Sequence, residues 1–230
     1  MRFLRLLLLF GLVWAAPVRA DFQAGVEAYK AGDYQTALAE WLPLAEAGNA
    51  DAQFNVGLIH DGGQGVPRDY DKAVYWYRKA AEQGLAEAQY YLANMQIKGQ
   101  GSKAPMTESC DWALKSAQGG YAPAQEAIAL GYVHGDCGLP KDPWLAMEWA
   151  EKSAMQGDEL GLVTVVEILL HLHRTRAWAW MRIAEDIGHP KAPKLRALLE
   201  DHLTQGQIRQ GNRDYDKLKI EFQKNNQGKP

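Results

Sequence analysis

The amino-acid sequence predicts an all-α protein, a right-handed α-solenoid built from repeated helix pairs. Five glycines close helix-length amphipathic runs at spacings of 36, 36, 37 and 31 residues: Gly48, Gly84, Gly120, Gly157 and Gly188. A small residue lies eleven positions before each of these glycines, and four of the five have a tryptophan eight positions before them. A fixed period of this length is typical of stacked helical repeats.

Composition limits the classes of protein that the chain can be. Its 230 residues are 47% apolar, which excludes wholesale disorder, and 22 glycines with 10 prolines indicate many short helices. Without the three arginines of the first twenty residues, the formal net charge falls from −3 to −6. An acidic chain does not match the phosphates of nucleic acid, so we expect no nucleic-acid partner.

Residues 1–20 have the pattern of a secretory signal peptide. Arg2 and Arg5 precede an apolar run of 11 residues, Leu6–Ala16, and small residues then lead to a cleavage site between Ala20 and Asp21. The alternative, an uncleaved anchor helix, is disfavoured because the run is too short to span a bilayer. The mature chain is therefore expected to be periplasmic or secreted, and not transmembrane after processing.

Five repeats are expected over residues 21–189, with approximate units 22–48, 49–84, 85–120, 121–157 and 158–188. Each unit pairs a first helix, such as Ala52–His60, Ala88–Lys98, Ala124–His134 or Leu162–His171, with a second helix that ends at the closing glycine. In the second unit the linking segment ends at Asp69, a good N-cap. In the third unit Thr107 is the expected cap. Residues 190–223 are predicted to form capping helices (Lys191–Leu203 and Gln207–Phe222) that cover the last apolar face, and residues 224–230 to fray.

The second unit carries a recognisable motif. The pattern A-x-x-x-x-G, then G-x-G-V-x-x-D-x-x-K-A-x-x-W-Y-x-K-A-A-x-Q-G-x-A-x-A, resembles the Sel1-like repeat, a relative of the tetratricopeptide repeat, and its best match runs from Gly57 to Ala88. Unit one, with Gly25, Gly32 and Ala37, looks more like an ordinary tetratricopeptide repeat. The resemblance covers about residues 22–215. It implies protein–protein or protein–glycan scaffolding in the bacterial envelope and no shared catalytic residue.

The two cysteines are expected to pair. Cys110 lies early in the second helix of unit three, and Cys137 lies in the link of unit four, so both fall at the same end of adjacent units. In an oxidising compartment a disulfide closing this loop of 27 residues would stabilise the fold by roughly 3 kcal/mol. The alternatives are two unpaired thiols or one thiol bonded to a partner. Two cysteines alone are too few for a metal site.

A partner is expected to bind on the concave face, which first helices line in superhelical stacks. The candidates are polar or aromatic residues near the start of each first helix: Gln53, Asn55, Gln89, Tyr90, Asn94, Gln125 and Glu126. Simple solvent exposure is the alternative for each. Tyr75, Tyr77, Trp144 and Trp178 are possible interface anchors, although their helical spacing favours packing between repeats.

No catalytic or cofactor site is predicted. The acidic residues fall at caps and on faces turned to water, and no nucleophile is accompanied by a base. His171 and His173 are two positions apart, which is the wrong spacing for a helical metal site. The sequence therefore predicts a non-enzymatic scaffold that binds an unidentified protein. The alternatives are a protein that binds cell-wall glycan or regulates a cell-wall hydrolase, and a component of a flagellar or secretion machine.

Overall fold

The computed structural model describes residues 20–227 and contains twelve helices over that range. The predicted signal peptide, except Ala20, lies outside the described residues. The helices are α1 (Phe22–Lys30), α2 (Tyr34–Glu46), α3 (Ala50–Gly62), α4 (Tyr70–Glu82), α5 (Ala86–Ile97), α6 (Met106–Gln118), α7 (Ala122–His134), α8 (Pro143–Met155), α9 (Glu159–Leu172), α10 (Arg174–Asp186), α11 (Ala192–Glu200) and α12 (Gln205–Asn226).

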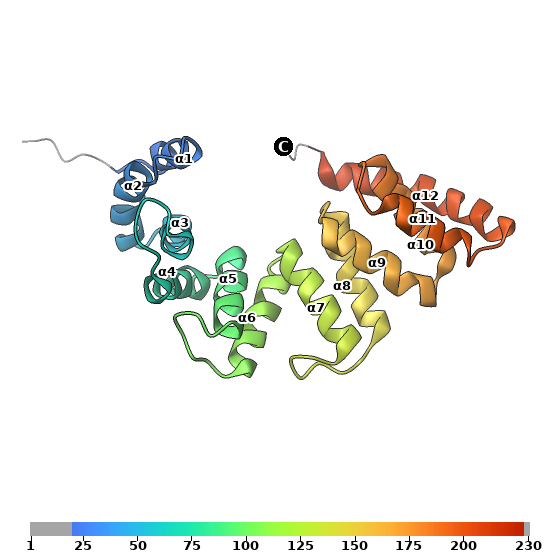
Figure 1. Cartoon of the computed structure of the whole chain (residues 1–230), viewed down its shortest axis with the longest axis horizontal. Coiled ribbons are helices and arrows are strands. Elements are labelled where there is room, and N and C mark those ends of the chain that lie inside the picture. The colour runs from blue at the N-terminus through green and yellow to red at the C-terminus, as the bar shows by residue number, and fades with distance from the viewer. Residues whose placement is uncertain (1–19, 228–230) are drawn as a thin grey trace, which may run out of the picture.

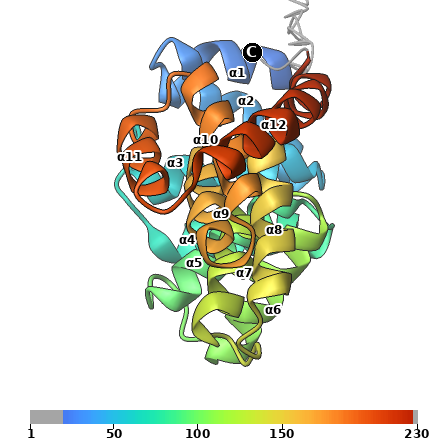
Figure 2. The same ribbon diagram turned by 90° about the vertical axis from the view of Figure 1, so that its right-hand side faces the viewer.

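The helices form a curved stack of pairs, which confirms the predicted helical solenoid. In Figure 1 the chain describes an arch with α1 at one end and α12 at the other, and α1, α3 and α5 lie on the inner side of α2, α4 and α6. Figure 2 shows the same stack from its C-terminal side, with α12 crossing in front of the last pairs. Helices α7 and α9 hold the first place in their pairs, as α3 and α5 do.

The local sequence explains both ends of the second helices. Asp69 accepts a hydrogen bond from the backbone N–H of Lys72 and so caps α4 as predicted. Past the other end of α4, Gly84 has a φ of +92°, a left-handed conformation that glycine adopts at least cost. Between these points Ala73 and Tyr77 are fully buried, so the small-residue and aromatic stripe is the packing face.

Several predicted boundaries differ from the observed ones. The first helices of units two to four begin two residues earlier than expected, and α9 starts at Glu159 rather than Leu162. The N-cap of α6 is Pro105, so the expectation for Thr107 was wrong and Thr107 lies inside the first turn. Proline at that place lacks an N–H that would have had no partner, and its fixed φ suits entry into a helix.

The C-terminal segment forms a cap, but its tail is longer and more ordered than predicted. Helix α12 continues to Asn226, whereas fraying was expected from residue 224. The reason is that the Asn226 side-chain amide donates hydrogen bonds of 2.9 Å to the carbonyls of Met155 and Phe222. Phe222 also packs edge-on against Trp180, at 6.4 Å between ring centroids. These contacts tie the last helix back to units four and five. Residues 228–230 lie outside the described part.

No helix among the described residues is long and apolar enough to cross a membrane. The largest apolar cluster lies in the last third of the stack, where Leu162, Leu169, Trp180 and Met181 are fully buried. Burial of large aliphatic and aromatic side chains is the main stabilising contribution to such a stack.

Candidate partner-binding surface

The first helices of units two to five share an exposed stripe. On α5 the side chains left at least partly exposed include Glu87, Tyr90, Tyr91, Asn94 and Ile97, which recur at helical spacing and lie opposite the buried positions. The corresponding stripes on α3, α7 and α9 lie at equivalent positions of their units. We call these four stripes together the inner face. The main members of the other three are Asp51, Phe54, Asn55, Leu58, Asp61, Pro123, Glu126, Ala127, Leu130, Val133, Leu160 and Glu167. On α9 the stripe is interrupted, because residues 161–166 are buried.

Contacts between successive first helices join the inner face from α3 to α7 and place α9 beside it. The rings of Phe54 on α3 and Tyr91 on α5 lie 5.3 Å apart between centroids. Tyr90 on α5 and Tyr121 at the start of α7 lie 5.2 Å apart. Farther along, Thr164 on α9 donates a hydrogen bond of 3.2 Å to the Glu126 carboxylate on α7. The four first helices therefore lie side by side, and those from α3 to α7 present one surface.

An aromatic row crosses the centre of this surface. Its members are Phe54, Tyr91, Tyr90 and Tyr121, all half-buried, with Tyr90 and Tyr91 joining the two ends at 6.0 Å. Of these four residues, only Tyr90 was predicted from the sequence as a partner-binding residue. Asn55 and Tyr91 occupy equivalent positions of successive units. The repeat spacing that relates them was therefore a signal by which Tyr91 could have been predicted along with Asn55. A run of half-exposed rings is the kind of surface that anchors protein partners.

Carboxylates surround the aromatic row and change its electrostatics. Burial raises the pKa of Glu126, and nearby Asp158 adds to the rise. Burial likewise raises the pKa of Tyr121 to about 12, with further contributions from neighbouring tyrosines and from Glu87 and Asp158. In both cases the largest cause is burial, which disfavours a charge of either sign, and the nearby carboxylates add a smaller contribution that disfavours negative charge.

Three of the predicted partner-binding residues have a different role. Gln53, Gln89 and Gln125 are only 4%, 7% and 6% exposed, not surface residues as expected. Each donates its side-chain amide to the carbonyl eight residues earlier, at 3.0 to 3.2 Å, and so binds a carbonyl near the end of the preceding helix. Each of those carbonyls also accepts a hydrogen bond from the backbone N–H of the closing glycine, so the glutamine is its second partner at a buried helix end. The glutamines are therefore structural residues of the turns between units.

The other four predicted residues do lie on the inner face. Asn55, Tyr90, Asn94 and Glu126 are half-buried, and they come from α3, α5 and α7. Asn94 lines a cavity of about 240 Å³ together with Tyr91, Asp61 and two bases, Arg68 and Lys98. This cavity opens between the end of α3 and α5, next to the aromatic row. Whether these residues bind a partner remains a prediction.

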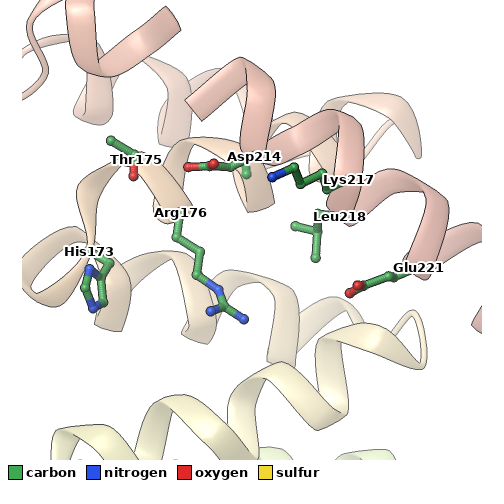
Figure 3. Close-up of a pocket in the computed structure, with 8 residues that line it drawn as sticks. His173, Thr175, Arg176, Asp214, Lys217, Leu218 and Glu221 are labelled. Carbon is green, nitrogen blue, oxygen red and sulfur yellow. The ribbon is translucent and has the colours of Figure 1, made fainter. Parts of the chain in front are cut away.

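A second hollow lies at the C-terminal end of the stack. Figure 3 shows His173, Thr175 and Arg176 from the start of α10 opposite Asp214, Lys217 and Glu221 on α12, around a cavity of about 360 Å³. Arg176 is paired with Glu151 at 2.7 Å, and Asp214 accepts a hydrogen bond from Gln210. Part of its polar lining is thus already engaged within the protein.

The four aromatic residues considered as anchors divide into two pairs. Tyr77 and Trp178 are buried and pack between helices, as their spacing favours. Tyr75 and Trp144 are 53% and 51% exposed, which differs from that expectation. Trp144 lies at the start of α8 and contacts the ring of His173, at 5.4 Å between centroids, beside the C-terminal cavity.

The two cysteines form a disulfide between α6 and the link that follows α7. Cys110 is buried in the second turn of α6, and Cys137 is an exposed residue of the link, with their Cα atoms 5.5 Å apart. The bond fastens the long α7–α8 link to the preceding unit. Among the described residues no group of three or more His, Cys, Asp or Glu side chains is placed to hold a metal ion.

Comparison with known proteins identifies the repeats. A family model described as the Sel1 repeat matches residues 50–85, 86–121 and 122–158. Its units are the helix pairs α3–α4, α5–α6 and α7–α8, and proteins with this repeat generally act as protein–protein interaction scaffolds. No curated protein matches the sequence.

Two solved structures resemble most of the stack. One is a protective antigen of uropathogenic Escherichia coli strains that displays an SLR fold, with a TM-score of 0.76, 27% identity and coverage of 87% of this chain and 45% of that one. The other is a Sel1 repeat protein from Oxalobacter formigenes, with a TM-score of 0.65, 28% identity and coverage of 71% and 49%. The chain thus spans about half the length of both. The chain is thus identified as a protein with three consecutive Sel1 repeats, over residues 50–158, and its structural neighbours are Sel1-repeat or SLR-fold proteins.

Proposed function

We propose that this chain is a non-enzymatic scaffold of the bacterial cell envelope that holds a protein partner against its inner face. The observation that carries the proposal is the aromatic row, Phe54, Tyr91, Tyr90 and Tyr121, which crosses three successive units and is left half-exposed. Aromatic side chains dominate the energetics of protein interfaces because they bury much area at little cost in conformational entropy.

The rigidity of the stack supports the same function. Three kinds of contact fix neighbouring units relative to one another: the hydrogen bonds of the buried glutamines, the disulfide, and the hydrogen bond from Asn226 of α12 to Met155 of α8. A surface that is already formed before binding loses little conformational entropy when a partner arrives. The placement outside the cytoplasm is supported by the disulfide, which persists in oxidising compartments, and by the signal-like pattern of residues 1–20.

Photo-crosslinking from the two faces tests this function. We would replace Asn94, on the inner face, with p-benzoylphenylalanine, and in a matched variant Glu82, exposed on α4. Irradiation of the bacterial envelope should give one dominant protein adduct from position 94 and none of the same mass from position 82. Equal labelling from both positions, or no protein adduct from position 94, would refute binding on the inner face. Turnover of a cell-wall substrate by the purified chain would contradict a non-enzymatic role.

A second candidate function, glycan binding, is favoured by Trp144. This side chain is half-exposed and lies against His173 at the rim of a polar cavity, an arrangement of apolar ring and hydrogen-bonding groups that suits a sugar. Co-sedimentation with purified peptidoglycan tests it. Wild-type protein should pellet with the wall and Trp144→Ala should not, while Tyr75→Ala, an exposed aromatic residue in unit two, should behave as wild type. Identical sedimentation of all three proteins would exclude this site.

A further inference from the structure

Charged residues are divided unevenly between the two layers of helices. The first helices α3, α5, α7 and α9 contain six acidic residues and no lysine or arginine. The second helices α4, α6, α8 and α10 contain eight acidic residues and eight lysines and arginines. Lys98, directly after α5, is the base nearest to the first helices in sequence. The first helices are therefore acidic, whereas the second helices are balanced. Two bases outside the first helices, Arg68 and Lys98, line the cavity beside Tyr91.

The bases of the outer layer are held in place by other side chains. The ammonium groups of Lys115 and Lys152 each lie 4.2 Å from the ring centroid of a tryptophan on their own helix. Arg78 pairs with Glu108 at 3.0 Å across α4 and α6. These contacts keep positive charge on the outer side of the stack.

The inner carboxylates have no such partners. In the part of the chain that the structure describes, no lysine or arginine forms an ion pair with Asp51, Glu87, Glu126 or Glu167. Asp51 and Glu87 occupy equivalent positions of successive units, in the first turns of α3 and α5. Asp51 lies three residues before Phe54 on the stripe of α3, and Glu87 lies three residues before Tyr90 on the stripe of α5.

We propose that the inner face binds a basic segment of its protein partner, with lysine or arginine side chains over the aromatic row and against the carboxylates beside it. This inference rests on the proposed function and adds the chemistry of the partner. Two independent features support it: half-exposed rings, a kind of side chain that attracts cations, and carboxylates on the same stripes that form no ion pair with a described residue. The balanced outer layer offers a basic segment no comparable net attraction.

Fluorescence anisotropy with two synthetic peptides tests the charge. One fluorescein-labelled peptide alternates lysine and alanine, and the other replaces each lysine with glutamate. At low salt the lysine peptide should bind and the glutamate peptide should not. The double variant Asp51→Asn, Glu87→Gln should weaken binding about tenfold, since each exposed pair contributes a modest amount. The matched variant Glu82→Gln, Asp111→Asn removes two exposed carboxylates of α4 and α6 and the same charge, and should bind like wild type.

A second pair of variants tests the rings. Tyr90→Leu keeps the apolar bulk but loses the ring, and should weaken the lysine peptide by about threefold, while Tyr75→Leu on the outer layer should have no effect. Circular dichroism of each variant checks that the stack is intact.

Some outcomes would overturn the inference while the proposed function stands. If position 94 crosslinks a protein but the lysine peptide does not bind, the inner face is an interface of different chemistry. If the inner and outer double variants lose affinity for the lysine peptide equally, the binding is a general effect of net charge. That result would also overturn the inference. If the lysine peptide binds as expected but no protein adduct forms at position 94, the proposed function fails instead.

Discussion

Gln89 donates its side-chain amide to the backbone carbonyl of Ala81 at 3.1 Å, from the first turn of α5 back to the end of α4. The same bond joins Gln53 to Ala45 and Gln125 to Ala117. In two of the three units a second glutamine extends it, since Gln83 donates to the Gln53 side chain at 2.7 Å and Gln156 to that of Gln125 at 2.8 Å. The turns between units are thus held by polar bonds inside an apolar stack.

Replacing Gln89 should therefore destabilise the fold. Gln89→Ala removes one of two hydrogen bonds to the Ala81 carbonyl, which still accepts from the Gly84 N–H, and it also removes buried side-chain packing. We therefore expect a loss of about 1–2 kcal/mol in the free energy of unfolding. Urea denaturation followed by circular dichroism measures it. Gln118→Ala, at an exposed position at the end of α6, is the control and should change stability by less than about 0.5 kcal/mol. Equal midpoints for the two variants would show that the buried bond contributes nothing.

The glutamines also show how far the sequence predicts this protein. The helix pairs, the Asp69 cap and the glycines that close each unit follow from local rules, because a cap or a left-handed turn involves only neighbouring residues. By these local rules, a buried glutamine in the first turn of a helix cannot be distinguished from a glutamine on the surface. Its partner lies across the turn in the preceding helix, and only the folded arrangement shows the bond. The sequence did contain one signal for this structural role: a glutamine recurs five residues after Gly48, Gly84 and Gly120.

The inner face was predicted in part for a related reason. Asn55, Tyr90, Asn94 and Glu126 were selected because polar and aromatic residues stand out on a helix, and the structure places them on the stripe. The aromatic row depends on how successive helices align. This alignment places the ring of Phe54 against Tyr91 rather than Tyr90. The register between neighbouring helices is a tertiary property that a repeat length does not determine.

Glu126 should make stability depend on pH. Burial raises the pKa of its carboxyl in the folded state, so the folded protein binds this proton more tightly than the unfolded chain. Its contribution is favourable below the unfolded pKa, about pH 4, and is lost as the pH rises through the folded pKa. Glu126→Gln removes the charge and should stabilise the protein at pH 7 but not at pH 3.

Urea midpoints at the two pH values measure the effect of Glu126→Gln. Glu82→Gln, on the exposed side of α4, is the matched control and should show no difference between pH 7 and pH 3 relative to wild type. A less stable Glu126→Gln protein at pH 7 would mean that the hydrogen bond from Thr164 to the carboxylate outweighs the cost of burial.

Loss of the disulfide should weaken the third and fourth units. The bond between Cys110 and Cys137 closes a loop of 27 residues, which corresponds to roughly 3 kcal/mol if the constraint acts on the unfolded chain. The double variant Cys110→Ser, Cys137→Ser should lose about that amount and should be cleaved faster by protease in the α7–α8 link. A reducing agent should shift the melting temperature of wild type and leave the double variant unchanged. A shift of the double variant would point to an effect unrelated to the disulfide.

Gly57 should not tolerate a side chain. A Cβ atom at this position of α3 would lie 2.6 Å from the ring of Tyr77, and that ring is fully buried and cannot move aside. We expect Gly57→Ala to cost about 1–3 kcal/mol through overpacking, although alanine is the better helix former. Gly206→Ala in α12 is the matched control, because its Cβ would meet nothing nearer than 3.8 Å. It should raise stability by up to about 1 kcal/mol. Because the paired helices α3 and α4 meet at Gly57, a neutral Gly57→Ala would mean that this pair packs more loosely than the contact distance indicates.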